Sequence, residues 1–304
     1  MELRHLRYFV AVAEERNITR AAERLAIQQP PLSRLLKALE AEVKARLLVR
    51  VPRGVELTEA GLAFYEGARR VLQGVDDALE RTRSTARGER GRICIGVTPT
   101  GPFVPFVPKC LAAFRETYPE VSLTIEESLS GDLMDGVRVG KIDAAFLWTP
   151  RAEGLINMPL VEDELVVALP SRHLLASARR GRGSSIQLNA LAKETFVVYG
   201  RKDGFGLYAA TIAACHSAGF SPRFGEESPR LASALGLVAA GLGIFFIPAS
   251  LQRVHVDGVV YRALQGPKLP KSTLSLVSRR GERSAVVRNF VALARKAATI
   301  GQAR

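Results

Sequence analysis

Cysteine is scarce in this chain of 304 residues, and its three cysteines, Cys94, Cys110 and Cys215, stand far apart. They form no Cys-x-x-Cys pair, so the spacing excludes a disulfide framework and a cysteine-based zinc site. Isolated thiols of this kind fit a reducing compartment, and we expect each of them to be a small residue of the core.

Long apolar runs are also missing. The longest, Leu235–Leu251, is shorter than a membrane span and contains three glycines and a proline. Near the N-terminus, "YFVAVA" is too short to be the core of a signal peptide. We therefore expect a cytoplasmic protein with no membrane partner.

Enzyme motifs are almost absent. No Gly-x-Ser-x-Gly, His-Glu-x-x-His or Walker A segment occurs, and the histidines lack metal-ligand spacing (His5, His173, His216 and His255). "GFGLYA" (204–209) fits a dinucleotide fingerprint after "TFVVY", with Glu226 about 20 residues further on. Because "GRKD" separates the expected strand from these glycines, a nicotinamide-dependent oxidoreductase is a remote alternative. We therefore expect that the protein is not an enzyme and that it binds no cofactor.

Negative charge is in deficit. The net charge is +13, which indicates a polyanionic partner. Residues 1–90 carry 17 basic and 13 acidic side chains, and residues 91–304 carry 26 and 17. Because the excess is spread over the chain, charge alone does not locate a nucleic-acid site.

The first 58 residues are predicted to form a small helical domain. Apolar residues recur at i, i+3, i+4 and i+7 in two stretches: Leu6, Phe9, Val10 and Ala13, and then Leu32, Leu35, Leu36 and Leu39. Between them a short helix is expected, with Thr19 as its N-cap. The last helix should begin at Pro30-Pro31, because proline is favoured in a first helical turn.

With the leucines buried, one polar face of this last helix is left outward. It carries the residues that we predict to bind DNA, namely Gln28, Gln29, Pro30, Pro31, Ser33, Arg34 and Lys37. Glutamine pairs with adenine, arginine with guanine, and serine with phosphate or base, as on a helix in the major groove. The alternative is a three-helix bundle with an ordinary solvated face.

The following segment strengthens the DNA-binding interpretation. "LLVRVPRGVELT" predicts a hairpin that turns at residues 52–54 and brings Arg50 or Arg53 to the phosphates or the minor groove. Residues 59–90 are then predicted to form a long helix, capped by Thr58. Its apolar stripe needs a partner to cover it, and a second copy of the chain is the simplest one. A dimer would present two recognition helices about 34 Å apart, or a multiple of that. Residues 84–92 have the composition of a linker.

From residue 91 onward, expected strands and helices alternate. Strands are expected around residues 92–99, 121–128, 142–148, 165–170, 195–200, 244–250 and 272–280. Helices are expected at 108–119, 131–141, 206–220, 229–243 and 284–298. This alternation predicts parallel sheets with helices on both faces, arranged as two lobes. A ligand would lie at the carboxyl ends of the strands, in the crevice between the lobes.

The sequence resembles the LysR-type transcriptional regulators over nearly its whole length, most closely the aromatic-catabolism subgroup. The resemblance rests on "LRHLRYFVAVAEERNITRAAERL", "QQPPLSRLLKALE", "RGVELTEAG", "IDAAF" and "LGLVAAGLGIFFIPAS". It implies an all-α winged helix-turn-helix, a dimerisation helix, and a two-lobed α/β effector domain like a periplasmic binding protein. Lobe I would be 91–161 with 268–304, and lobe II 162–267.

The resemblance also implies partners. They are double-stranded promoter DNA, a small-molecule effector, RNA polymerase, and copies of the same chain in a homodimer that assembles to a homotetramer acting as an activator. In the DNA-binding domain, Gln29, Pro30, Ser33 and Arg34 match recognition-helix contacts, and Arg53 matches the wing arginine. The family usually has serine where this chain has Gln28.

In the effector domain the resemblance points to three loops. The matching residues are Thr98, Pro99, Thr100 and Gly101, then Ser128 and Ser130, then Arg201, Lys202 and Phe205, with Trp148 where relatives place an arginine. We interpret these as a site for an aromatic or conjugated carboxylate that alters DNA binding and bending. Three alternatives stay open: loop and capping hydroxyls without a ligand, a redox-sensing or ligand-independent regulator, and a solute-binding protein.

Overall fold

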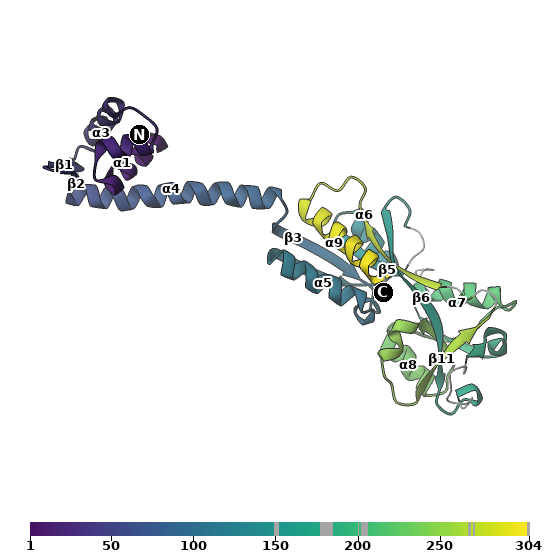
Figure 1. Cartoon of the computed structure of the whole chain (residues 1–304). Coiled ribbons are helices and arrows are strands. Elements are labelled where there is room, and N and C mark those ends of the chain that lie inside the picture. The colour runs from purple at the N-terminus through teal and green to yellow at the C-terminus, as the bar shows by residue number, and fades with distance from the viewer. Residues whose placement is uncertain are drawn as a thin grey trace. The chain divides into compact units, whose positions relative to one another are not determined.

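The structure is a computed structural model that describes residues 1–148, 152–176, 185–199, 201, 206–266, 269 and 271–302. The chain forms two compact units, Met1–Ser84 and Thr85–Arg304 (Figure 1). Among the described residues, no helix combines the length and the apolar character needed to cross a membrane.

Three helices form the core of the first unit: α1 (Leu3–Glu15), α2 (Ile18–Arg24) and α3 (Gln29–Val43). Their apolar faces meet around Phe9, Leu32 and Leu39, which are buried. The two prolines lie in the first turn of α3, as predicted. The prediction that Thr19 caps α2 is wrong, because the amide oxygen of Asn17 accepts the N–H groups of residues 19 and 20.

A hairpin follows α3, made of β1 (Leu48–Val51) and β2 (Gly54–Leu57), which pair antiparallel around the predicted turn. Gly54 has a φ of +142°, and a Cβ there would lie 2.1 Å from the carbonyl oxygen of Arg16. That same oxygen accepts the N–H of Val55 at 2.9 Å. The hairpin is thus held against the end of α1, and only glycine permits the approach.

The long helix α4 runs from Glu59 to Ala86. Its cap is Thr58, whose hydroxyl accepts the N–H of Gly61 at 2.8 Å, as predicted. Leu62, Val71 and Leu79 are about half exposed along it. The helix continues to within four residues of the next strand at Arg90, so the segment predicted as a linker is mostly regular structure.

In the second unit, three parallel strands lie side by side in the order β4-β3-β5: β3 (Arg90–Val97), β4 (Glu120–Glu127) and β5 (Ala144–Trp148). Three helices pack with them: α5 (Phe106–Thr117), α6 (Ser130–Arg138) and α9 (Ala285–Gln302). The rings of Phe114, Phe146 and Phe290 make edge-on contacts in the core of this lobe I. Because the strands are parallel, the loops that follow them leave the same edge of the sheet.

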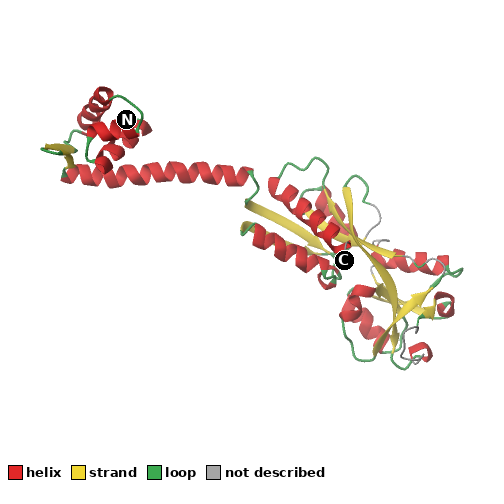
Figure 2. Ribbon diagram, in the orientation of Figure 1, coloured by secondary structure: helices red, strands yellow, loops and turns green. Residues whose placement is uncertain are grey.

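Next to β5, β12 (Lys271–Ser278) runs antiparallel to it, and β6 (Ile156–Pro170) pairs antiparallel with β12 on its other side. β6 is long enough to pair with β12 in lobe I and then with β10 (Phe245–Pro248) and β11 (Val259–Gln265) in lobe II. The main sheet, whose strands are yellow in Figure 2, is therefore mixed: the prediction of parallel sheets is wrong where β12 pairs with β5 and β6, and where β6 pairs with β10 and β11.

Lobe II also contains a parallel pair, β8 (Thr195–Tyr199) and β9 (Arg223–Ser228), and the short strand β7 (Ile186–Gln187). Its helices are α7 (Gly206–Ser217) and α8 (Leu231–Ala239). Short 3-10 helices complete the unit: η1 (Gly101–Phe103), η2 (Leu174–Ala176), η3 (Leu188–Leu191) and η5 (Ala249–Arg253). Among these, η1 of lobe I lies next to η5 of lobe II.

Candidate nucleic-acid interface and inter-lobe junction

The outer face of α3 carries the side chains that the sequence predicted. Gln28, Gln29, Pro30, Arg34 and Lys37 are exposed, whereas Pro31 and Ser33 are half-buried. Within residues 1–84, the structure gives neither Arg34 nor Lys37 an ion pair. Two unpaired cations on one face of a short amphipathic helix are available to polyanions.

One pair on this face is already ordered. The side-chain amide of Gln29 donates to the hydroxyl of Ser33 at 2.9 Å, one helical turn further along. Within residues 1–84 the amide oxygen of Gln29 is left without a partner, and the bond to Ser33 orients the amide. A glutamine held in this way is prepared to pair with a base edge, since less rotamer entropy remains to be lost.

The hairpin is held to α3 by a residue that the sequence analysis missed. One carboxylate oxygen of Glu40 accepts the N–H groups of Leu47 and Leu48, at 2.8 and 3.1 Å. Arg50 and Arg53 lie beyond this anchor and are both exposed. The anchor was not predictable from spacing, because a glutamate at the end of a helix is ordinarily solvated.

The second candidate site, the inter-lobe junction, is the carboxyl edge of β3, β4 and β5 together with the parts of lobe II that meet it, α7 and η5. Thr98, Ser128 and Trp148 stand at this edge, because each lies at or just after the end of one of the three parallel strands. From lobe II, α7 lies next to β5, and η5 lies next to η1.

A buried chain of polar groups runs through the junction. The indole N–H of Trp148 donates to the hydroxyl of Thr100 at 2.8 Å, and that oxygen lies 3.4 Å from the hydroxyl of Thr98. All three side chains are buried, with exposed fractions of 3%, 1% and 4%. Pro99 between them is half-buried, and the buried Gly101 donates its N–H to the carbonyl of Thr98.

The other predicted effector residues are placed less uniformly. The hydroxyl of Ser128 donates to the carboxylate of Asp132 at 2.9 Å, so it has a local partner. Ser130 is buried at the first position of α6, and Arg201 is exposed. Lys202 and Phe205 lie outside the described residues, as does Gly204, whereas the last four residues of "GFGLYA" form the start of α7.

Lobe II approaches Trp148 at one glycine. Gly206, the first residue of α7, has a φ of +63°, and a Cβ there would lie 3.8 Å from the carbonyl oxygen of Trp148 and 4.0 Å from its Cβ. The start of α7 thus lies against the backbone and the Cβ of Trp148. Trp148 therefore belongs to the contact between the two lobes.

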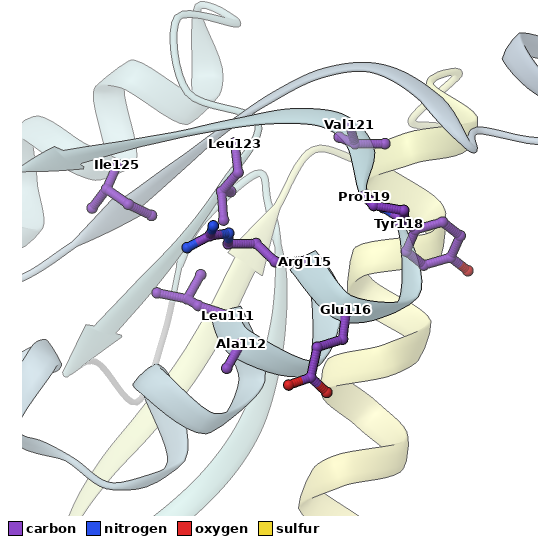
Figure 3. A pocket seen from close by; sticks show the side chains of 9 residues that line it. All are labelled: Leu111, Ala112, Arg115, Glu116, Tyr118, Pro119, Val121, Leu123 and Ile125. Atoms are coloured by element: carbon purple, nitrogen blue, oxygen red, sulfur yellow. The ribbon is translucent and has the colours of Figure 1, made fainter.

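A groove of about 740 Å³ lies elsewhere on lobe I, between α5 and β4. Figure 3 shows the side chain of Arg115 pointing between Leu111 and Leu123, with Ile125 further along the strand. None of the predicted effector residues lines this groove. The sequence analysis assigned it no role, because its apolar residues read as an ordinary packed helix and strand.

The cysteines are placed as core residues. Cys110 and Cys215 are buried, and Cys94 is half-buried. Burial raises the pKa of both the Cys110 and the Cys215 thiol to about 12. Thiols of this kind are poor nucleophiles, because the thiolate is the reactive form. In the part of the chain that is described, no cluster of histidine, cysteine and acidic side chains could hold a metal ion.

A helix that exposes two cations on a winged helical unit, followed by a two-lobed α/β unit, is typical of a class of DNA-binding transcriptional regulators. Residues 3–62 match the family described as "Bacterial regulatory helix-turn-helix protein, lysR family", and residues 86–299 match "LysR substrate binding domain". The chain belongs to the LysR family and is a DNA-binding transcriptional regulator with a substrate-binding domain.

Relatives match it almost from end to end. BudR of Raoultella terrigena is 36% identical over 293 residues, which cover 96% of this chain and 99% of BudR. BenM of Acinetobacter baylyi is 35% identical over 270 residues, 88% of this chain and 86% of BenM. Among solved structures, full-length CbnR complexed with its target DNA has a TM-score of 0.79 at 29% identity and covers 98% of this chain and 100% of CbnR.

Proposed function

We propose that this regulator reads an operator with α3 and its hairpin. Gln29, Ser33 and Arg34 contact base edges in the major groove, with Gln28, Pro30, Pro31 and Lys37 beside them. Arg50 and Arg53 hold the DNA backbone. The observation that carries this proposal is the outward face of α3, on which Arg34 and Lys37 are exposed without ion pairs and Gln29 is held by Ser33.

The protein acts as a dimer through α4, and two dimers assemble to a tetramer. Support comes from Val71 and Leu79, which are about half exposed and lie toward the same side of a helix of 28 residues. Such a stripe is stabilised by pairing with a second copy, because its apolar surface is then removed from water. Two recognition helices about one DNA turn apart, near 34 Å, then predict an operator with dyad symmetry.

The inter-lobe junction binds the effector, a carboxylate with an aromatic or conjugated body. Support comes from the hydroxyls of Thr98 and Ser130 at the carboxyl edge of the sheet, where open α/β sheets bind ligands. A ligand there touches both lobes, so its binding energy changes how they meet. That change alters DNA bending and contact with RNA polymerase. The protein thus acts by binding and not by catalysis.

The first test is selection of bound fragments from a random DNA pool by the full-length protein, followed by footprinting. We expect an enriched sequence with two half-sites in dyad symmetry. Failure to enrich any sequence would contradict the operator proposal. Sedimentation at several concentrations then measures whether dimers and tetramers form.

The effector is sought by thermal shift of the full chain against aromatic carboxylates, aliphatic dicarboxylates, amino acids and nicotinamide nucleotides. A ligand at about 100 times its Kd adds about 2.7 kcal/mol of stability, which is readily measured as a rise in Tm. A carboxylate that shifts the Tm and alters the footprint supports the proposal. A panel in which only nucleotides bind, or nothing binds, contradicts the effector class and leaves the operator proposal standing.

A further inference from the structure

Trp148 holds an unusual place at the inter-lobe junction. It is the last residue of β5, yet its indole reaches Thr100 in the turn that follows the neighbouring strand β3. Because β3 and β5 are parallel neighbours, the ring must lie across the carboxyl end of the sheet. With 3% of its surface exposed, it is buried at this edge of the sheet, against the turn that carries Thr100.

The hydrogen bond of Trp148 changes what the threonine hydroxyls can do. Indole nitrogen only donates, and its N–H is directed at the oxygen of Thr100 at 2.8 Å. The oxygen of Thr98 lies 3.4 Å from that same oxygen. When the hydroxyl of Thr100 accepts the indole N–H and donates its own O–H to Thr98, the O–H of Thr98 is left to donate to a ligand.

The same arrangement leaves no free donor on the indole. A carboxylate placed against Trp148 meets an uncharged ring whose single N–H is already occupied. It would lose its hydration without compensation, which is costly in a buried site. An apolar ring placed there instead loses little, because aromatic faces and edges attract one another.

We propose that Trp148 determines the effector class, and that Thr100 is the residue that positions it. The junction then takes a monocarboxylate whose carboxylate meets Thr98 and whose flat apolar body lies against the indole, and it rejects a second carboxylate at the far end. The inference rests on the proposed effector site. It extends that proposal in two ways. It distinguishes monocarboxylates from dicarboxylates as effectors, and it distinguishes the ligand-binding role of Thr98 from the positioning role of Thr100.

The test uses benzoate and terephthalate, two rigid probes that differ by one carboxylate, titrated calorimetrically into the full-length protein. We expect the wild type to bind benzoate more tightly by about tenfold or more, because of the unpaired second charge. Trp148→Arg supplies a cation in place of the ring, so its preference should shift toward terephthalate. Trp148→Phe keeps an uncharged ring and should keep the preference for benzoate.

The positioning role of Thr100 has an optical readout, since Trp148 is the only tryptophan in the sequence. Thr100→Val removes the acceptor of the indole N–H, so it should shift the tryptophan emission and weaken benzoate binding. Thr100→Ser should restore both. Thr124→Val is the matched control, because it removes a hydroxyl that bonds to a strand carbonyl in the same lobe.

The outcomes separate the two proposals. If the wild type binds terephthalate as tightly as benzoate, or Trp148→Arg leaves the preference unchanged, the selection role is wrong while the effector site stands. If Thr100→Val weakens binding without shifting the emission, Thr100 touches the effector itself and is no positioning residue. If no carboxylate of the wider panel binds the wild type, the proposed effector site fails and this inference fails with it.

Discussion

The two units of this chain present their candidate functional side chains in opposite ways. On the first unit, Arg34, Lys37 and Arg53 are exposed and carry no ion pair within residues 1–84. In the second unit, Thr98, Thr100 and Trp148 are buried, and their polar groups bond mainly to one another. A surface that reads DNA needs free charges, whereas a buried site needs its polar groups satisfied until the ligand arrives.

The contrast extends to how each site is supported. The proposed DNA-binding surface depends on the attachment of the hairpin, through Glu40 and through the close approach of Gly54 to Arg16. The junction depends on two lobes joined by a strand, β6, that belongs to both. We therefore expect damage to the first site to act through stability and geometry. Damage to the second should act through ligand selectivity.

The largest effect is expected on the stability of the first unit, at the contact between α4 and the start of the hairpin. A Cβ on Gly61 would lie 2.0 Å from the carbonyl oxygen of Leu47, so Gly61→Ala should force the backbone apart and cost about 3 kcal/mol or more. Gly74 lies on the same helix and has nothing within 4 Å of such a Cβ. Gly74→Ala should stabilise the helix by about 0.5–1 kcal/mol.

Thermal unfolding and operator binding measure this pair of variants. Equal effects of Gly61→Ala and Gly74→Ala would show that the contact with Leu47 is unimportant. Carboxylate binding by Gly61→Ala should stay unchanged, because the altered contact lies in the first unit.

The next largest effect is expected from Arg34 and Arg53, which we propose to contact bases and the DNA backbone, respectively. Arg34→Ala should cost about 1–3 kcal/mol of specific binding and relax base preference at one position. Arg53→Ala should weaken binding across all sequences and flatten its salt dependence, because it removes the proposed phosphate contact. Binding to operator variants at several salt concentrations distinguishes the two. Identical behaviour would contradict the separation into base and backbone contacts.

A smaller effect should separate two hydroxyls of the junction. Thr98→Val removes the proposed donor to the carboxylate and should weaken benzoate binding by about tenfold. Ser128→Ala should change it by less than about twofold, because the hydroxyl of Ser128 already bonds to Asp132. Calorimetric titration of both variants measures the difference. A loss of affinity in Ser128→Ala as large as in Thr98→Val would place Ser128 at the ligand instead.

The smallest effect is expected at the cysteines. Burial raises the pKa of Cys110 and Cys215 to about 12, so both stay neutral at pH 8, and native protein should react with Ellman's reagent at Cys94 alone. The pKa of each buried thiol is higher in the folded than in the unfolded protein. The stability contributed by burying these two neutral thiols is therefore full below pH 9 and is lost as the pH rises toward 12. All three thiols should react in denaturant.

Mild peroxide should leave operator binding unchanged. Loss of binding that a reductant reverses would instead revive the redox-sensing alternative.

The fold was predictable where the local pattern and the tertiary environment agree. The leucines of α3 and the prolines of its first turn indicate the helix and its outward face, because an amphipathic helix has one solution for its apolar stripe. The parallel strands β3, β4 and β5 were predictable for a similar reason. The strands β9 and β11 and the first half of β6 were not, because their mixed polar patterns become strands only through pairing partners far along the chain.

The amino-acid sequence was enough to predict the outward polar face of α3 from periodic spacing, and to assign the family and the loops with the candidate effector residues from the resemblance. That Glu40 holds the hairpin and that β6 belongs to both lobes became visible in the folded structure alone. The same holds for the indole N–H of Trp148, which donates to the hydroxyl of Thr100. These are bonds between residues distant in the chain, and their geometry exists only after the strands and helices have packed.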